Sequence, residues 1–380
     1  MTDAFALNED QRSIQEAAAR FTASALTPHA AQWDEDHSFP REAVSAAGEM
    51  GFGAIYVSEA GGGIGLGRLD AALVIEAMAY GCPTTAAFIS IHNMATWMID
   101  RFGNEALKAR HLPGLVGMQT LASYCLTEPG SGSDAAALRT TARRDGDDYV
   151  LNGSKQFITG AGVNDVYVIM VRTGEAGARG ISCFLVEKGM PGLSFGAPEK
   201  KLGWNASPTA QVILEDVRVP AGNMLGVEGD GFKIAMAGID GGRVNIGACS
   251  LGGAQRCLDE AIAYTKERRQ FGQPIADFQN TQFQLADMAT ELAAARTLLY
   301  TAASKVSAGA PDKTAYAAMA KRFATDTGSS VVDRALQMLG GYGYLKDYPI
   351  ERFWRDLRVH RILEGTNEVM RLIVARDLLK

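Results

Sequence analysis

The chain has 380 residues, of which 47% are hydrophobic, and its net charge is -6, from 37 Lys and Arg against 43 Asp and Glu. This length exceeds one ordinary hydrophobic core, so two or three domains are expected, and the lack of any long basic run argues against a broad nucleic-acid-binding surface. The five widely spaced cysteines form no CxxC pair, which favours buried structural thiols in a reducing compartment. Since neither a targeting segment nor an 18-residue apolar run is found, we expect a cytoplasmic protein that does not enter a membrane.

Residues 1–120 are predicted to form a helical domain. Asn8, with Gln11 three residues later, resembles a capping box, and apolar residues continue at helical spacing until Pro28. Glycine-rich turns separate the helical segments expected after it. These segments are 41–50, 69–80, 89–102 and 105–112.

Residues 121–227 are predicted to form a small β-domain, and residues 228–380 a second helical domain. Asn152-Gly153 lies between two apolar runs and is typical of a type I′ hairpin turn. Helical periodicity returns most clearly between Phe283 and Leu299. The order of helices, strands and helices predicts an α+β fold without the strand–helix alternation of a parallel sheet. Further strands are expected at 166–171, 181–186 and 212–219.

Glu364 is the first candidate catalytic residue. It follows Ile362-Leu363 and precedes Gly365, and Thr366 has the position of an N-cap for the helix that ends the chain. A carboxyl group buried in such a turn has a raised pKa and could act as a general base. The alternative is that Glu364 is an exposed turn residue and that Glu368 complements the helix N-terminus.

The segment Tyr124–Asp134 combines two glycines with serines and a threonine. Glycines allow a ligand to approach the backbone, and hydroxyl and N–H groups can bind a polar ring edge or a phosphate. Gly130, Gly132 and Ala135 also match GxGxxA, which leaves a nicotinamide-binding alternative open although no βαβ unit surrounds the match. A plain surface turn is the third interpretation.

Three further polar clusters lie in the C-terminal domain. The glycines of 337–344 could contact a cofactor or another subunit, or form a helix C-cap and turn. Arg268 and Arg269 could hold a pyrophosphate, or only complement a helix C-terminus. Asp240-Gly-Gly-Arg243 could be a binding group or a helix-entry turn. The five histidines show no ligand spacing, so no metal site is expected.

Together these motifs resemble the acyl-CoA dehydrogenase family. Residues 125–137 (CLTEPGSGSDAAA) fit the first signature of that family, and the spacing of Gln, Gly, Tyr, Asp and Arg in 337–356 fits the second. Shorter stretches, SIHNM at 90–94 and GGYGYLKDY at 340–348, indicate members that act on isobutyryl-CoA. The resemblance runs from Leu7 to Leu379.

The resemblance implies an N-terminal helical domain, a middle β-domain and a C-terminal four-helix bundle, with FAD bound between them in a homotetramer built as a dimer of dimers. It implies α,β-dehydrogenation of an acyl-CoA, with Glu364 as the base, flavin N5 as the hydride acceptor and electron-transferring flavoprotein as the electron acceptor. The Glu364 N–H and a ribityl hydroxyl would polarise the thioester carbonyl.

Site residues are also implied by the resemblance. FAD would contact Tyr124, Leu126, Thr127, Ser133, Phe157, Ile158, Thr159, Thr366 and Glu368 in one subunit, and Arg268, Phe271, Gln279, Gln337, Gly340 and Gly341 in its neighbour. Substrate and CoA would contact Ser133, Asp240, Arg243 and Arg376. The sequence departs from the usual pattern at Phe157, where many relatives have Trp, and at Glu368, which is often Gln or Asn.

Several functional alternatives stay open at this point. Leu363, where medium-chain relatives have Tyr, favours a short branched acyl group and hence isobutyryl-CoA and valine degradation, but 2-methylbutyryl-CoA and short straight-chain substrates remain alternatives. An acyl-CoA oxidase of the same fold is another alternative function. Non-catalytic, nucleic-acid-binding relatives have a basic C-terminal domain, whereas residues 310–380 here interleave acidic and basic residues.

Overall fold

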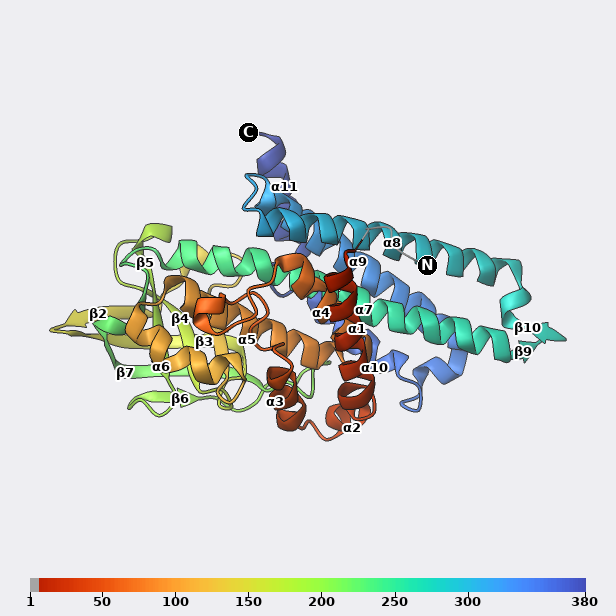
Figure 1. Cartoon of the computed structure of the whole chain (residues 1–380), viewed down its shortest axis with the longest axis horizontal. Helices are drawn as coiled ribbons and strands as arrows, with labels where there is room; N and C mark the ends of the chain where they lie inside the picture. The colour runs from red at the N-terminus through yellow and green to blue at the C-terminus, as the bar shows by residue number, and fades with distance from the viewer. Residues whose placement is uncertain (1–6) are drawn as a thin grey trace.

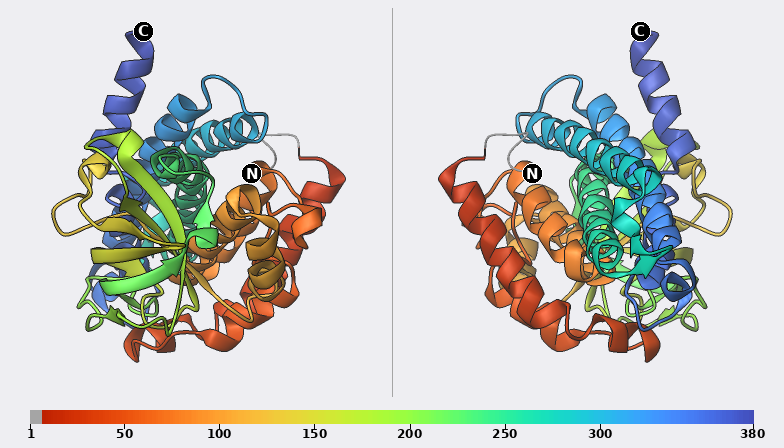
Figure 2. Two further views of the ribbon diagram at one scale, coloured as in Figure 1. Left: turned by 90° about the vertical axis from the view of Figure 1, so that its left-hand side faces the viewer. Right: turned by 90° about the vertical axis from the view of Figure 1, so that its right-hand side faces the viewer.

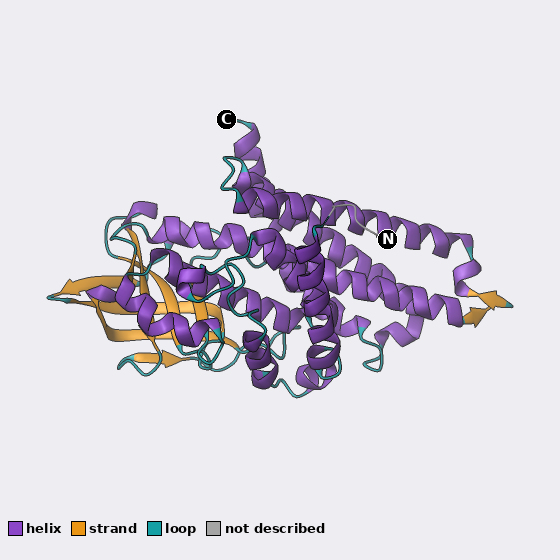
Figure 3. Ribbon diagram, in the orientation of Figure 1, coloured by secondary structure: helices purple, strands orange, loops and turns teal. Residues whose placement is uncertain are grey.

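Helices form the N- and C-terminal parts of the chain and a mixed sheet lies between them, which confirms the α+β prediction. In the computed structural model, which describes residues 7–380, the sheet gathers at one end of the long axis and helices extend to the other (Figures 1 and 3). Within those described residues, no helix combines the length and the apolar character needed to cross a bilayer.

The N-terminal part begins with the predicted capping box. The Gln11 N–H donates to Asn8 Oδ1 at 2.8 Å, and the Asn8 N–H donates to Gln11 Oε1 at 3.1 Å. The helix predicted at 89–102 begins earlier, at Pro83, because proline suits the first turn of a helix. The helices are α1 Glu9–Phe21, the π-helix η1 Thr22–Leu26, α2 Ala30–Glu35, α3 Arg41–Glu49, α4 Arg68–Gly81, α5 Pro83–Phe102 and α6 Glu105–Val116.

The middle part is one sheet with the order β6-β7-β3-β2-β4-β5-β8, and β1 pairs with β4. Its strands are β1 Ala122–Cys125, β2 Thr141–Asp145, β3 Asp148–Thr159, β4 Val166–Arg172, β5 Ile181–Glu187, β6 Leu193–Phe195, β7 Thr209–Pro220 and β8 Met224–Leu225. Most pairs are antiparallel, but β1 runs parallel to β4, and β2 meets β4 in one parallel pair. The sheet is therefore mixed.

The predicted hairpin at Asn152-Gly153 is wrong. β3 passes straight through both residues, and its register against β7 shifts between Leu151 and Gly153, which is a β-bulge. Gly153 is required there because its φ is 143° and a Cβ would lie 2.7 Å from Thr140 Oγ1. The actual hairpin joins β2 to β3 through Gly146, whose φ is 66°.

The C-terminal part is a four-helix bundle of α7, α8, α9 and α10, and α11 packs on α9 and projects from the body (Figures 1 and 2). A small hairpin of two strands joins α7 to α8 at the end of the molecule far from the main sheet (Figure 1). The helical periodicity at 283–299 lies within α8, as predicted. The bounds are α7 Gly231–Glu267, β9 Arg269–Gln270, β10 Gln273–Pro274, α8 Gln279–Ser307, α9 Lys313–Leu339, α10 Ile350–Arg358 and α11 Asn367–Leu378.

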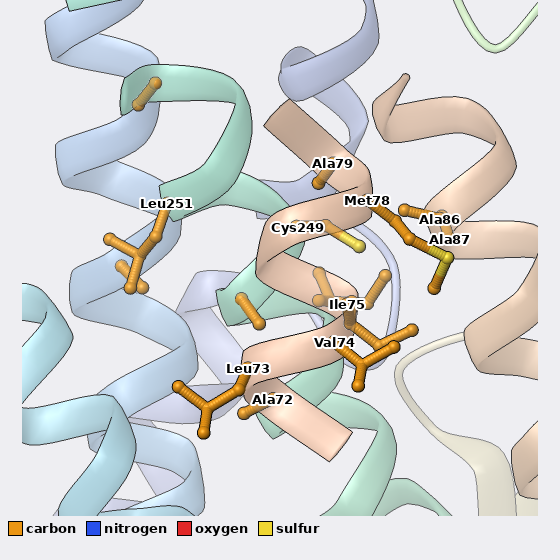
Figure 4. Close-up of a cluster of buried hydrophobic side chains, with 14 of the residues drawn as sticks. Ala72, Leu73, Val74, Ile75, Met78, Ala79, Ala86, Ala87, Cys249 and Leu251 are labelled. Atoms are coloured by element: carbon orange, nitrogen blue, oxygen red, sulfur yellow. The ribbon is translucent and has the colours of Figure 1, made fainter. Parts of the chain in front are cut away.

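The main core lies where α4 packs between α5 and α7 (Figure 4). Leu73, Ile75 and Met78 of α4 are buried against side chains of the two neighbouring helices. Gly252 of α7 lets the helices approach closely, since a Cβ there would lie 2.1 Å from the Glu76 carbonyl oxygen. All five cysteines are free and buried, as predicted.

One carboxyl group joins the three parts of the chain. Asp356 of α10 accepts hydrogen bonds from the Trp204 N–H at 2.6 Å and from Thr84 Oγ1 at 2.9 Å. Burial raises the pKa of Asp356 to about 6, against the opposing positive charge of Arg352. The helical N-terminal part, the sheet and the bundle are thus fixed to one another around this residue, while the domain boundaries after residues 120 and 227 stay predictions.

Candidate active site

Glu364 lies in a turn between the short helix η8 (Val359–Arg361) and α11. Its φ is 55°, a left-handed conformation that non-glycine residues rarely adopt and that occurs often at functional sites. The residue as a whole is half-buried, but Oε2 is shielded from solvent and has no hydrogen-bond partner. The interpretation of Glu364 as an exposed turn residue is therefore wrong.

The Glu364 carboxylate lies directly against the backbone of α7. A Cβ at Gly242 would be 2.6 Å from Glu364 Oε2, so no larger residue fits there without movement. Asp240-Gly-Gly-Arg243 lies in the interior of α7, so the interpretation of this motif as a helix-entry turn is wrong. Gly242 of this motif provides the space that the Glu364 carboxylate occupies.

Burial and the charged groups around Glu364 together set its pKa. Burial raises the pKa of Glu364 to about 7, and the positive charges of Arg243 and Lys321 oppose the rise. Arg243 Nε donates to the Glu364 carbonyl oxygen at 3.4 Å, and Arg243 Nη1 pairs with Asp240 Oδ1 at 2.8 Å. Asp240 Oδ2 in turn accepts from Thr314 Oγ1 at 2.7 Å. The base candidate is thus held in a buried network with a pKa near neutrality.

Lys321 of α9 is a member of this network that the sequence reasoning missed. It is fully buried, and its Nζ donates to the Gly365 carbonyl oxygen at 2.7 Å and to Asn367 Oδ1 at 2.9 Å. Burial lowers the pKa of Lys321 to about 8, against the opposing charge of Glu364. The available signal was a single lysine on an alanine-rich helix face, between buried Ala317 and Ala324.

The predicted residues of the middle part meet at one edge of the sheet. Tyr124, Leu126 and Thr127 lie at or just after the end of β1, and Phe157 to Thr159 end β3. The Gln156 N–H donates to the Thr127 carbonyl oxygen at 2.8 Å, which fixes the two segments side by side. The Tyr124 hydroxyl lies 3.5 Å from the Ala235 carbonyl oxygen of α7, the helix that also contacts Glu364, and burial and then the charge of Glu364 raise the pKa of Tyr124.

Two residues at this edge are exposed rather than buried. Phe157 is 64% exposed and has a φ of 59°, so its ring is available to a ligand. Ser133 is exposed in the turn after β1. The nicotinamide interpretation of Gly130 to Ala135 is wrong, because the segment leads into the single 3₁₀ turn Ala135–Ala137 and not into the helix that a dinucleotide fingerprint requires.

The start of α11 confirms the predicted N-cap, since Thr366 Oγ1 accepts from the Val369 N–H at 3.3 Å. Glu368 in the first turn and Arg376 near the end of α11 are both exposed. Neither belongs to the buried network around Glu364.

A second group of predicted residues surrounds a pocket at the far end of α7. The pocket has a volume of about 470 Å³ and is lined by Arg268, Gln337, Gly340 and Gly341 together with tyrosine rings. A Cβ at Gly340 or Gly341 would meet no atom within 4 Å, so their backbone is open to a ligand. The predicted residues Phe271, which is 95% exposed, and Gln279, also exposed, lie outside the pocket lining.

The two groups of residues do not meet within one chain. Arg243 and Arg268 are separated by roughly 37 Å along α7, at a rise of about 1.5 Å per residue. Figure 1 accordingly has the β9–β10 hairpin and the main sheet at opposite ends of the molecule. One cofactor could contact both groups only if two copies of the chain contribute to its site.

Comparison with known proteins decides the family. Models of the N-terminal, middle and C-terminal domains of acyl-CoA dehydrogenases match residues 8–119, 123–217 and 229–379. The chain belongs to the acyl-CoA dehydrogenase family. It is therefore an oxidoreductase that acts on CH–CH groups and dehydrogenates acyl-CoA thioesters, as the sequence motifs predicted.

Curated relatives extend the likeness over the whole chain. An isobutyryl-CoA dehydrogenase of *Dictyostelium discoideum* is 56% identical over 375 residues, covering 98% of this chain and 90% of the relative. That of *Bos taurus* is 53% identical over 374 residues, with the same coverage, and both are named as mitochondrial. The predicted likeness to isobutyryl-CoA dehydrogenases is confirmed.

Solved structures have the same fold. A chain in the solved structure of the electron transferring flavoprotein of Acidaminococcus fermentans is 44% identical, with a TM-score of 0.97 and full coverage of both chains. Butyryl-CoA dehydrogenase from Megasphaera elsdenii is 39% identical, with a TM-score of 0.96 and full coverage of both. PigA, solved with FAD and proline, is 32% identical, with a TM-score of 0.96 and 99% coverage of both.

Proposed function

We propose that the chain catalyses the FAD-dependent α,β-dehydrogenation of a short, branched-chain acyl-CoA, with isobutyryl-CoA as the favoured substrate and Glu364 as the base. This proposal rests mainly on Glu364 Oε2, which is shielded from solvent and has no hydrogen-bond partner. Burial raises the pKa of the Glu364 carboxyl group to about 7. A general base is most effective when its pKa is near the working pH. The two relatives named isobutyryl-CoA dehydrogenase support the choice of acyl group.

The residues present fit FAD. Arg268 offers a planar guanidinium suited to a pyrophosphate, beside the open backbone of Gly340 and Gly341, and the exposed Phe157 ring offers a face for stacking. A structural relative solved with FAD supports the same cofactor. When bound, FAD would supply an acceptor for the hydride that leaves the substrate β-carbon.

The chain supplies the proton transfer and the orientation of the substrate. Glu364 Oε2 takes the α-proton, and the neutral carboxylic acid that results suits its buried position. The Glu364 N–H has no acceptor within residues 7–380, so it is free to donate to the thioester carbonyl, where negative charge develops. Arg243 holds the Glu364 carbonyl oxygen and so fixes the turn that presents both groups.

The deciding experiment is an anaerobic panel of acyl-CoAs with the FAD-loaded enzyme, followed by bleaching of the flavin absorbance. We expect rapid bleaching by isobutyryl-CoA, slower bleaching by 2-methylbutyryl- and butyryl-CoA, and little by octanoyl-CoA. A flavin that stays yellow with every acyl-CoA would refute the proposal. Hydrogen peroxide release in air, at a rate equal to turnover with a dye acceptor, would instead identify an oxidase.

We also propose a homotetramer that passes its electrons to electron-transferring flavoprotein. The distance along α7 between the two groups of predicted FAD contacts supports at least a pair of chains per site. Phe271 is 95% exposed and Phe283 57% exposed at the same end of the molecule, which supports contact with another copy. The molar mass in solution, and turnover with the flavoprotein in place of a dye, test these two proposals.

Lys321→Met is predicted to shift the pH dependence of turnover. Activity that depends on ionised Glu364 should rise with pH through about 7, and loss of the Lys321 charge should raise the Glu364 pKa by about one unit. The measurement is the acid limb of kcat/KM against pH. Lys321→Arg, which keeps the charge, and Arg322→Met on the same helix should leave the limb in place, whereas an unmoved limb in Lys321→Met would contradict the prediction.

Arg268→Ala is predicted to lower the FAD content of the purified protein by about tenfold, because a bidentate contact to phosphate would be lost. Arg269→Ala is the matched control, since Arg269 is the next residue and its side chain, within residues 7–380, donates only to the exposed Gly272 carbonyl oxygen. The ratio of flavin to protein absorbance measures the effect. Equal flavin content in both variants would remove Arg268 from the proposed site.

A further inference from the structure

Arg68, at the start of α4, is a buried cation that the proposed reaction does not use. Its side chain lies with Cζ 3.5 Å from the centroid of the Tyr56 ring and 4.9 Å from that of Trp97, and the residue is only 7% exposed. The Nη1 atom is shielded from solvent and has no hydrogen-bond partner. Cation–π contacts offset part of the cost of burying the charge, but the donor remains unsatisfied.

Arg68 lies beside the base candidate. A Cβ at Gly241 would be 2.3 Å from Arg68 Nη1, and a Cβ at the next residue, Gly242, would be 2.6 Å from Glu364 Oε2. Two unpartnered charged atoms of opposite sign thus lie against successive residues of α7. The charge of Glu364 also contributes to the raised pKa of Tyr56, for which burial is the main cause, so the Tyr56 ring under Arg68 is close to the base as well.

Within residues 7–380, the carboxylate whose charge acts on Arg68 is already paired, and the nearby Glu364 Oε2 makes no hydrogen bond to it. This carboxylate is Asp240, which is already bound to Arg243 Nη1 at 2.8 Å and to Thr314 Oγ1 at 2.7 Å. Arg68 Nη1 is therefore a buried donor that no atom of the described residues satisfies.

The position of Arg68 identifies the end of the substrate that approaches it. CoA carries a large, charged nucleotide, which must extend to solvent. Tyr56, Arg68 and Asn245 are all buried, and α4, α5 and α7 pack together around them. Because packed helices close the region around Arg68, only the acyl group of the substrate can extend toward it.

We propose that Arg68 is a specificity-determining residue whose guanidinium forms the inner wall of the acyl site and restricts substrates to acyl groups that end before reaching it. This inference rests on the proposed function. A longer alkyl chain would press an apolar end against this buried guanidinium, whose Nη1 already lacks an acceptor, and would offer it none. A short branched chain ends before it reaches the guanidinium.

The test measures binding separately from turnover, with the unreactive thioethers isobutyl-CoA and hexyl-CoA and the FAD-loaded enzyme in a calorimeter. The wild type should bind the hexyl thioether at least tenfold more weakly than the isobutyl thioether. Arg68→Met, which has similar length but no donor, should reduce this ratio to below threefold and raise hexanoyl-CoA turnover relative to isobutyryl-CoA by at least tenfold. Arg68→Lys and the exposed control Arg101→Met should keep the wild-type ratio.

Two results would overturn the inference. One is equal binding of both thioethers by the wild type. This result is measured without any variant, so it can be obtained even if Arg68→Met does not fold. The other is a folded, flavin-loaded Arg68→Met whose thioether ratio stays within threefold of the wild type. In either case bleaching by isobutyryl-CoA would leave the proposed function intact, whereas failure of every acyl-CoA to bind and to bleach would refute both.

Discussion

Glu364→Gln is expected to slow substrate-driven bleaching of the flavin by about 10²- to 10⁴-fold, the contribution typical of a general base. Gln has the shape of Glu and so still fits against Gly242, but it cannot take a proton. Flavin content, oligomeric state and binding of the isobutyl thioether should be unchanged. Anaerobic single-turnover absorbance with isobutyryl-CoA measures the effect.

Glu368→Gln is the matched control for this variant, because Glu368 is an exposed carboxylate in the same segment and Gln, which relatives often have at this expected FAD contact, can keep that contact. It should keep wild-type bleaching. If Glu364→Gln bleached normally, the base would have to be assigned elsewhere, and Glu368 would be examined next.

Glu364→Gln should also change the free energy of unfolding, and the sign of the change can be predicted. The folded-state pKa of Glu364 is raised, so ionisation of this residue disfavours the folded state, and its stabilising contribution is lost as pH rises through about 7. Glu364→Gln cannot ionise. At pH 8 the variant should therefore unfold at the same denaturant concentration as the wild type or at a higher one, which separates a catalytic defect from a folding defect.

The order of structural elements could be predicted because it depends on local patterns. Helical periodicity and the Asn8–Gln11 capping box are properties of neighbouring residues, and both are found in the structure. Asn152-Gly153 carries an equally clear local signal, but pairing of β3 with β7 on one side and the close approach of Thr140 override it. The whole fold decides which strands flank a segment, and the sequence of the segment alone does not indicate them.

The site was predictable in its motifs but not in its arrangement. Glu364 and Arg268 both belong to recognisable patterns, yet nothing local indicates that roughly 37 Å of α7 separate Arg268 from Arg243, which holds the Glu364 turn. Lys321 and Arg68 were missed for a related reason. Each is one charged residue in a mostly apolar helix, and its role depends on which helix packs against it.

The largest expected effect on stability is at a buried ion pair, between Glu128 and Lys155. Lys155 Nζ donates to Glu128 Oε1 at 2.7 Å and to the Leu126 carbonyl oxygen at 3.2 Å, and Lys155 is fully buried. Glu128→Ala should lower the free energy of unfolding by about 3–5 kcal/mol, because it leaves the lysine charge buried without its partner. Denaturant titration followed by circular dichroism measures the change.

The double variant Glu128→Gln with Lys155→Met is the control, since it removes both charges and should recover most of the lost stability. Lowering the pH should also reduce the free energy of unfolding, as Glu128→Ala does. Burial alone would raise the pKa of Glu128, but the Lys155 charge and the N–H groups of Arg139 and Thr140 lower it overall, below its ordinary value of 4.5. The stabilisation is therefore complete above pH 4.5 and is lost as pH falls through the folded-state pKa.

This ion pair also connects stability to the proposed cofactor site. Glu128 directly follows Thr127 and Lys155 directly precedes Gln156, whose N–H donates to the Thr127 carbonyl oxygen. Loss of the pair should therefore loosen the segment that carries Tyr124, Leu126 and Thr127, and flavin content should fall together with stability in Glu128→Ala. A variant within 1 kcal/mol of the wild type would mean that water satisfies Lys155, and a destabilised variant with full flavin content would mean that the loop holds its position without the pair.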